Sequence, residues 1–451
     1  MSLLVSGGAA VTSLDPPIVE PADVFVEGGH IVAVGRPAHP LATRQGTGDV
    51  IDAGGCLVIP GNVNAHTHLY SALARGMPYR LPPAADFVQI LQRVWWRLDR
   101  ALDDETIRAS ALIGGMEALL AGTTTLIDHH ASPNAIHGSL DIVAEALAVV
   151  GIRSVCCYEV SDRDGPQRAQ AGLAENERFL RRVGVGELPL ARGMVGAHAS
   201  FTLSPETLAA CVALSRETGA GLHVHAAEDA ADEADAERRF GVRVTRRLTD
   251  AGALDARTLL AHGVHLDEDE ARLVRESGAT LAHNPRSNMN NAVGRAPFAW
   301  LGDRVALGTD GIGADMFAES QAAFFRLSED GASPTPAWPL ARLAVGAGLA
   351  GRVFGEPSFG RITPGAPADL VILDYDAPAP LTSHSLAGHW LYGLGSRWVR
   401  DVIVAGSAVV RERRLVRVDQ DELAAAARVQ ANRLWDRLES IDAHPFSPQP
   451  A

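Results

Sequence analysis

The run Pro60-Gly61-Asn62-Val63-Asn64-Ala65-His66-Thr67-His68 decides the fold expected for this chain. Its composition is typical of a short buried strand, and the side chains of a strand alternate between its two faces, so His66 and His68 share one face. Two imidazoles spaced in this way can bind a single metal ion. The run therefore predicts a strand that ends in metal ligands.

Seven further runs of the same kind follow it, and amphipathic helical stretches such as 104–121, 205–218 and 267–277 lie between them. This alternation is the pattern of parallel βα units, and eight strands predict a distorted (β/α)8 barrel of the TIM type. The eight predicted strands are 63–68, 124–129, 154–159, 193–197, 221–226, 258–263, 280–284 and 305–310.

Both ends of the chain are β-rich, around residues 3–5 and 24–34 and again around 368–374 and 399–406. Chain ends often lie close together, so we expect these segments to form one small β-sandwich. The predicted domains are a composite sandwich (1–59 and 359–420), the barrel (60–358), and a C-terminal helix with its tail (421–451).

Composition narrows the class of protein. The apolar fraction of 47%, the charged fraction of 21% and the net charge of −14 fit a globular enzyme and argue against a nucleic-acid partner. No signal peptide or membrane-spanning run is visible, and the four cysteines form no Cys-x-x-Cys pair, so a cytoplasmic location is expected. The sequence has no lysine, which excludes a Schiff-base lysine, a P-loop lysine and a carbamylated lysine that bridges two metals.

Histidines recur at the carboxyl ends of the predicted strands, where barrel enzymes place their active sites. A single buried histidine is usually a hydrogen-bonded core residue, but recurrence at one end of successive strands favours a common site. His137, His384, His389 and His444 do not fit this pattern. The strand-end residues beyond the first strand are His129, His130, His198, His225, His262, His283 and Asp310.

Four of these strand-end side chains form a plausible ligand set for one divalent metal. The predicted ligands are His66, His68, His225 and Asp310. Neutral imidazoles with one carboxylate suit zinc, although iron, manganese or nickel would also fit. Such a metal lowers the pKa of bound water from 15.7 to about 7. Glu228, three residues after His225, is the expected proton carrier, with His262 and Asp310 sharing proton transfer.

Several motifs resemble the amidohydrolase superfamily. The run 60–68 resembles its first-strand motif, and Gly308-Thr309-Asp310-Gly311 its eighth. The stretches 222–228, 261–266 and 283–288 resemble the cytosine deaminase/chlorohydrolase (ATZ/TRZ-like) branch, and 363–374 resembles the closing strand of its sandwich. The narrower motifs at 95–99, 128–133, 198–204 and 288–294 are similar to those of SsnA-type aminohydrolases.

The resemblance implies a mononuclear metal enzyme that removes ammonia from an amino-substituted heterocycle, such as a purine, pyrimidine, pterin or triazine. It implies that Glu228 shuttles protons, His262 polarises the attacked group and His198 contacts substrate. His129 and His130 are weaker substrate-side candidates. Trp95 and Trp96 line the pocket or pack a helix, and packing is favoured.

Two other functions stay open at this point. One is hydrolysis of an amide, imine or carbon–chlorine bond on the same scaffold. The other is a non-catalytic assembly protein, which the complete set of expected ligands and Glu228 argue against. We also expect a small-molecule substrate, no membrane partner, and a homo-oligomer that is a dimer or larger.

Overall fold

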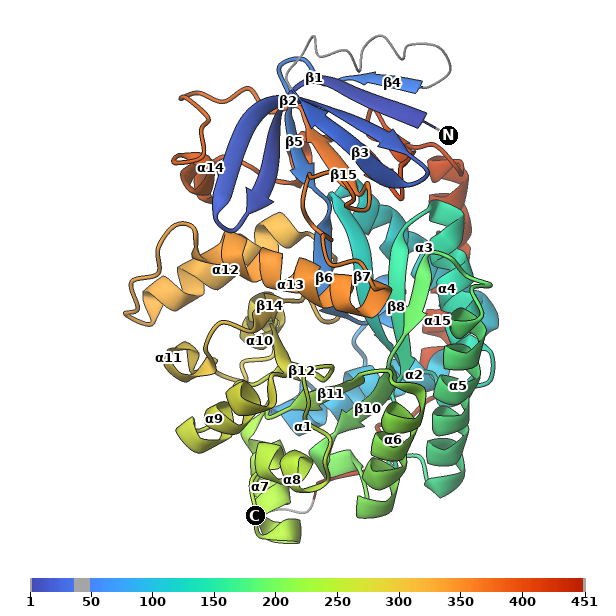
Figure 1. Ribbon diagram of the computed structural model, residues 1–451. Helices are drawn as coiled ribbons and strands as arrows, with labels where there is room; N and C mark the ends of the chain where they lie inside the picture. Colours follow the sequence, from blue (N-terminus) through green and yellow to red (C-terminus); the bar gives the residue numbers. More distant parts are fainter. Residues whose placement is uncertain (1, 36–48, 449–451) are drawn as a thin grey trace.

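The computed structural model describes residues 2–35 and 49–448. Residue 1 and residues 36–48 of the predicted sandwich, and residues 449–451 of the predicted tail, lie outside the described residues. Figure 1 shows a β-sheet domain above a larger body, in which helices surround parallel strands.

Strands from both ends of the chain form one nine-stranded sheet with the order β18-β17-β16-β15-β5-β1-β2-β3, and β4 pairs with β1. In this sheet β5 runs parallel to β1 and antiparallel to β15, so it joins the two ends. The expected shared β domain is confirmed, but its strands form one continuous sheet where a sandwich of two sheets was expected. Its strands are β1 (Ser2–Leu14), β2 (Pro17–Glu27), β3 (His30–Gly35), β4 (Asp49–Asp52), β5 (Leu57–Pro60), β15 (Leu370–Leu373), β16 (Val399–Val404), β17 (Ser407–Arg411) and β18 (Arg414–Leu415).

The central strands form two parallel sheets. The first has the order β6-β7-β8-β9 and the second β10-β11-β12-β13-β14. Each of the eight predicted strands corresponds to an observed strand, and β9 is additional. Their bounds are β6 (Asn62–Thr67), β7 (Thr123–His130), β8 (Arg153–Tyr158), β9 (Ala191–Gly193), β10 (Val195–Ala199), β11 (Leu222–Ala226), β12 (Leu259–His262), β13 (Thr280–His283) and β14 (Val305–Leu307).

The closed barrel that the eight strands predicted is not formed by continuous hydrogen bonding. Among the described residues, the β-pairing between the two sheets consists of the isolated bridges Thr67–Asp310 and Val160–Ala197. The strand β14 is three residues long, and at Asp310 the backbone turns to a left-handed conformation with φ of 54°. The ladder of β14 ends at Leu307, and Asp310, three residues further on, carries the isolated bridge to Thr67.

Helices connect the strands and cover their outer side (Figure 1). The predicted helical stretches 205–218 and 267–277 are observed: Ser204 caps the helix that begins at Pro205, and Asp267 forms a capping box with Glu270. The helices are α1 (Phe87–Ile90), α2 (Trp96–Ala101), α3 (Asp104–Leu120), α4 (Ser139–Val150), α5 (Pro166–Gly184), α6 (Pro205–Thr218), α7 (Ala230–Phe240), α8 (Val244–Asp250), α9 (Glu268–Ser277), α10 (Pro285–Asn290), α11 (Phe298–Leu301), α12 (Met316–Glu329), α13 (Trp338–Phe354), α14 (Leu386–Tyr392) and α15 (Gln420–Glu439). Shorter turns are η2 (Leu69–Ala74), η3 (Leu91–Trp95), η4 (Ser200–Thr202) and η5 (Ser396–Trp398).

The run that opened the sequence argument joins the two parts of the molecule. The strand β5 ends at Pro60 and β6 begins at Asn62, and a Cβ on Gly61 would lie 2.1 Å from the Thr124 hydroxyl. Asn64 then donates to the Thr309 hydroxyl over 2.7 Å and accepts from the Thr309 backbone N–H. Glycine at position 61 therefore permits close strand packing, and Asn64 holds the first strand against the end of the eighth.

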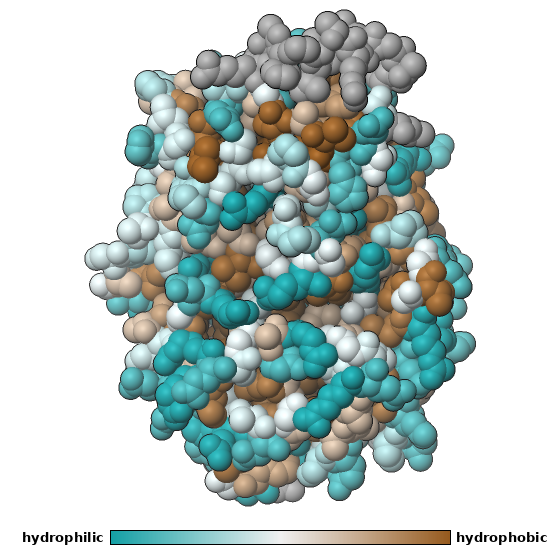
Figure 2. All heavy atoms as spheres, in the orientation of Figure 1, coloured by the Kyte–Doolittle hydropathy of each residue, from teal (hydrophilic) through white to brown (hydrophobic). Residues whose placement is uncertain are grey.

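In the described part of the chain, no helix is both long and apolar enough to cross a membrane. On the face drawn in Figure 2, hydrophilic residues cover much of the helical body, while apolar residues gather near the top, over the nine-stranded sheet.

Candidate metal centre and active site

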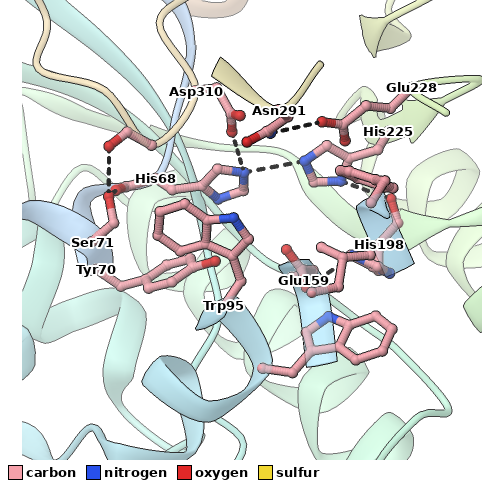
Figure 3. A pocket seen from close by; sticks show the side chains of 14 residues that line it. His68, Tyr70, Ser71, Trp95, Glu159, His198, His225, Glu228, Asn291 and Asp310 are labelled. Atoms are coloured by element: carbon pink, nitrogen blue, oxygen red, sulfur yellow. Dashed lines mark hydrogen bonds and ion pairs between the residues drawn. The ribbon is translucent and has the colours of Figure 1, made fainter. Parts of the chain in front are cut away.

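Four side chains from three strand ends converge at one point, and Figure 3 shows His68, His225 and Asp310 of this set. His68 Nε2 lies 3.1 Å from His225 Nε2 and 3.0 Å from Asp310 Oδ1, and His66 Nε2 lies 3.5 Å from the same carboxylate oxygen. Four ligands at about 2.0–2.1 Å around a tetrahedral zinc would lie about 3.3 Å from one another. The spacing of these atoms is therefore that of a ligand set before any cation is added.

Hydrogen bonds on the far side of the rings orient these nitrogens. His68 Nδ1 lies 2.6 Å from the carbonyl oxygen of His129, and His225 Nδ1 lies 2.9 Å from that of His198. A carbonyl can only accept, so both Nδ1 atoms carry hydrogen, and in the neutral rings the Nε2 lone pairs face each other. The buried Nε2 of His66 has no hydrogen-bond partner among the described residues.

Converging acceptors of this kind require a positive charge between them. Burial lowers the pKa of His68, but the Asp310 carboxylate outweighs it and raises that pKa to about 9. Either a proton or a metal ion satisfies the site, and three imidazole nitrogens with one carboxylate oxygen are a donor set that divalent metals bind. The residues present therefore fit the metal that the sequence predicted.

A second histidine of β11 supports the ligand set. His223 Nε2 lies 2.9 Å from His66 Nδ1, and His223 Nδ1 lies 3.6 Å from Cys157 Sγ. On the other side, the Ser287 hydroxyl donates to Asp310 Oδ2. Sequence reasoning missed His223, although it precedes His225 by the same two residues that separate His66 from His68.

Glu228 and His262 form a pair beside the converging ligands. Glu228 Oε2 lies 3.4 Å from His262 Nε2, and Glu228 Oε1 accepts from Asn291 Nδ2 over 3.5 Å. Burial, and then the negative charge of Asp310, raise the pKa of Glu228 well above its ordinary value. A carboxyl with a raised pKa is suited to taking and returning a proton near neutral pH.

His262 is held as a neutral hydrogen-bond donor. The side-chain amides of Asn288 and Asn284 lie 3.0 Å and 3.3 Å from His262 Nδ1 and donate to it. Burial lowers the pKa of His262 to about 3, so the ring carries one hydrogen, on Nε2, which faces Glu228. The ring can therefore donate a hydrogen bond to a group bound beside Glu228.

A pocket with an empty volume of about 480 Å³, which includes open solvent, lies over these residues. It combines aromatic rings with three carboxylates, as Figure 3 shows. Both Trp95 and Trp96 line it, which corrects the expectation that they mainly pack a helix. The lining residues are His68, Tyr70, Ser71, Phe87, Leu91, Trp95, Trp96, Glu159, His198, His225, Glu228, Asn291, Asp310 and Gly311.

The three predicted substrate-side histidines occupy different positions. His198 lines the pocket, with Nδ1 2.6 Å from the Thr202 hydroxyl and Nε2 directed toward Glu159. His129 and His130 do not line it. His129 lies behind the wall, 3.3 Å from Glu159 Oε2, and His130 bonds the Ser132 hydroxyl over 3.0 Å.

Glu159 is a pocket residue that sequence reasoning did not select. Its carboxylate pairs with Arg163 over 2.7 Å, and burial is outweighed by His198 and Arg163, which keep its pKa well below the ordinary value. It stands just beyond β8, at the same strand end as the histidines, and this position was the signal available. His283 is also buried but lines a separate small pocket with Phe298.

Residues 57–409 match the model of the Amidohydrolase family, and the chain belongs to this family. Its sequence is 34% identical over 448 residues to a 5-methylthioadenosine/S-adenosylhomocysteine deaminase of Haloarcula marismortui, covering 96% of this chain and 99% of that protein. It is 31% identical over 431 residues to a 5'-deoxyadenosine deaminase of Methanopyrus kandleri, covering 94% and 97%.

Solved structures of related enzymes share the fold of this chain. The chain resembles a zinc-bound adenosine deaminase from Xanthomonas campestris with a TM-score of 0.83 and 26% identity, over 96% of this chain and 98% of that one. The atrazine chlorohydrolase TrzN from Arthrobacter aurescens shares the fold, with a TM-score of 0.78 and 23% identity over 95% of this chain and all (100%) of that one. These matches confirm the predicted family and class of reaction, a metal-dependent aminohydrolase.

Proposed function

We propose that this chain removes the amino group from the adenine ring of a 5'-substituted adenosine. The observation that carries the proposal is the Glu228–His262 pair, placed beside the converging His66, His68, His225 and Asp310. The relatives named for 5-methylthioadenosine, S-adenosylhomocysteine and 5'-deoxyadenosine support the substrate class.

The reaction adds water to C6 of the purine and breaks the bond to the amino nitrogen, so that ammonia leaves and a carbonyl forms. His66, His68, His225 and Asp310 would hold a single divalent metal, zinc in our proposal, which would lower the pKa of water toward neutral. Glu228 Oε is placed to take a proton from the attacking water and to deliver it to the ring nitrogen beside C6. His262 Nε2 donates a hydrogen bond to the attacked side of the ring, and Asp310 assists proton transfer to the leaving ammonia.

The lining of the pocket supports a nucleoside. Tyr70, Trp95 and Phe87 offer aromatic surfaces against which a planar base can pack. Glu159 and His198 supply acceptors and a ring N–H within the same pocket, and sugar hydroxyls are the groups that such partners recognise. We assign substrate contact to His198 and Glu159 and a supporting position to His129 and His130.

The motifs similar to SsnA-type aminohydrolases support a narrower proposal. The stretches 128–133 and 198–204 contribute to the wall around Glu159 and His198. We therefore infer that the chain belongs to a group within the family, the SsnA-type aminohydrolases, that has its own substrate preference. The predicted domain boundaries, the cytoplasmic location and the homo-oligomer stay predictions.

Ammonia release from the zinc-loaded chain tests the function. The substrate panel contains 5'-deoxyadenosine, 5'-methylthioadenosine, S-adenosylhomocysteine, adenosine, guanine, cytosine and an amino-triazine, and Asp310→Ala serves as the inactive control. We expect the 5'-substituted adenosines to release ammonia faster than the other compounds of the panel. Ammonia release only from the triazine would overturn the proposed adenosine substrate class, and chloride release from the chlorinated triazine would replace the proposal with the alternative hydrolysis.

A further inference from the structure

The chain continues beyond its last helix and packs against a stretch that contributes to the wall of the pocket. After α15 ends at Glu439, residues 441–448, here called the C-terminal segment, cross the outer side of residues 87–101, which comprise α1, η3 and α2.

Hydrogen bonds to its backbone hold the C-terminal segment against residues 87–101 at several points. Arg97 Nε donates to the carbonyl of Ile441 over 2.6 Å, and Arg100 donates to that of Asp442 over 2.7 Å. Gln92 makes two hydrogen bonds to the later part of the segment. Its side-chain amide donates to the Phe446 carbonyl, and its backbone carbonyl accepts from His444 N, each over 2.8 Å.

Side-chain packing reinforces this attachment. Phe446 joins an apolar cluster with Trp96 and Phe201, with ring centroids 5.7 Å and 6.4 Å away. His444 is only 4% exposed and its ring lies 5.3 Å from that of Trp96. The Phe446 backbone N–H donates to His444 Nδ1, so the neutral ring carries its hydrogen on Nε2, which points to Asp164 at 3.3 Å.

The residues fastened in this way form the aromatic wall of the pocket. Phe87, Leu91, Trp95 and Trp96 all lie between residues 87 and 101 and all line it. The turn Leu91–Trp95 is π-helical, which places the adjacent Trp95 and Trp96 against the same cavity. The stretch is short and is interrupted by this turn, so its position depends on contacts from outside.

We propose that the C-terminal segment is part of the substrate site, with His444 and Phe446 as positioning residues that hold the aromatic wall against the bound base. This inference rests on the proposed function for its substrate. It assigns a role to His444, which did not fit the pattern of strand-end histidines, and to the C-terminal segment, which contains none of the predicted metal ligands.

Three full-length variants test it: Phe446→Ala, Phe446→Leu, and Ser447→Ala as the matched control, because the Ser447 side chain bonds only within the C-terminal segment. Misplacement of a binding group by about 1 Å can cost on the order of 10²-fold, so we expect KM for 5'-deoxyadenosine to rise about tenfold or more in Phe446→Ala. We expect kcat and zinc content to stay near wild type, with Phe446→Leu restoring much of the loss.

Hydrogen exchange supplies a readout independent of turnover. In Phe446→Ala, amides of residues 87–101 should exchange faster, while those of β6 and β11 should keep wild-type rates. The proposal would be overturned if Phe446→Ala and Ser447→Ala had equal KM values and equal amide exchange rates. It would also be overturned if Phe446→Ala raised KM but lowered kcat and zinc content to a similar extent. If wild type deaminates no 5'-substituted adenosine, the proposed function fails, and the exchange rates alone decide the role of the C-terminal segment.

Discussion

Replacement of Glu228 by glutamine tests the chemistry most directly. The Glu228 side chain is 13% exposed, and its oxygens lie 3.4 Å from His262 Nε2 and 3.5 Å from Asn291 Nδ2. Glutamine preserves the shape and can still accept from Asn291, but its amide does not take a proton at any working pH. Glu228 is not the cap of the following helix, because the Asp229 side chain accepts from Ala231 N in that position.

General acid–base groups contribute about 10²–10⁴-fold in rate, or about 3–5 kcal/mol of the barrier. Bulk water reaches this buried carboxyl poorly, so we expect Glu228→Gln to lower kcat by at least about 10³-fold. Zinc content should stay at the wild-type level, because Glu228 is not one of the four converging ligands. The assay is ammonia release together with metal analysis, and Asp229→Asn, which retains a capping side chain, is the matched control. Retained turnover in Glu228→Gln at full metal occupancy would refute this role and shift it to His262 and Asp310.

Three further outcomes follow from the geometry. Metal analysis should give about one zinc per chain and a clear loss in His68→Ala, and a value near two would contradict the mononuclear site. His223→Phe removes the hydrogen bond to His66, so zinc affinity measured by chelator competition should fall about 10–100-fold, whereas unchanged affinity would show that His66 is oriented without it. Gly196→Ala should lower the free energy of unfolding by about 1–3 kcal/mol in denaturant titrations, because its Cβ would meet a carbonyl oxygen of β8, while Gly184→Ala, with open space around it, should cost little.

Local patterns in the sequence predicted much of the fold. Strand composition located the eight central strands, and amphipathic periodicity located helices such as 205–218 and 267–277, because these signals act within a few residues. The sequence also predicted part of the metal site, because His66 and His68 share a face of one strand. Whether the strands close into a continuous barrel depends on their tilt and on the backbone at each seam, which no local pattern specifies.

The residues that sequence reasoning missed are those whose role depends on the opposite side of the site. Glu159 meets His198 from β10, and His223 meets His66 from β6. These are contacts between distant parts of the chain, so they become visible only in three dimensions. The sequence does single out Trp95 but favours packing for it, because the regular period of a helix does not predict its π-helical turn.

The backbone of Asp310 both links the two parallel sheets and places a predicted metal ligand. A left-handed conformation costs a residue other than glycine on the order of 1–3 kcal/mol and persists only where its surroundings fix it. Here Asp310 N donates to the His66 carbonyl over 3.0 Å, and the Asp310 carbonyl accepts from His68 N and from the Thr67 hydroxyl. These bonds form the isolated bridge to Thr67, and they hold the residue with its carboxylate directed at His66 and His68. The contact that joins the first strand to the end of the eighth therefore also positions the carboxylate, which explains why a strained conformation is kept at this residue.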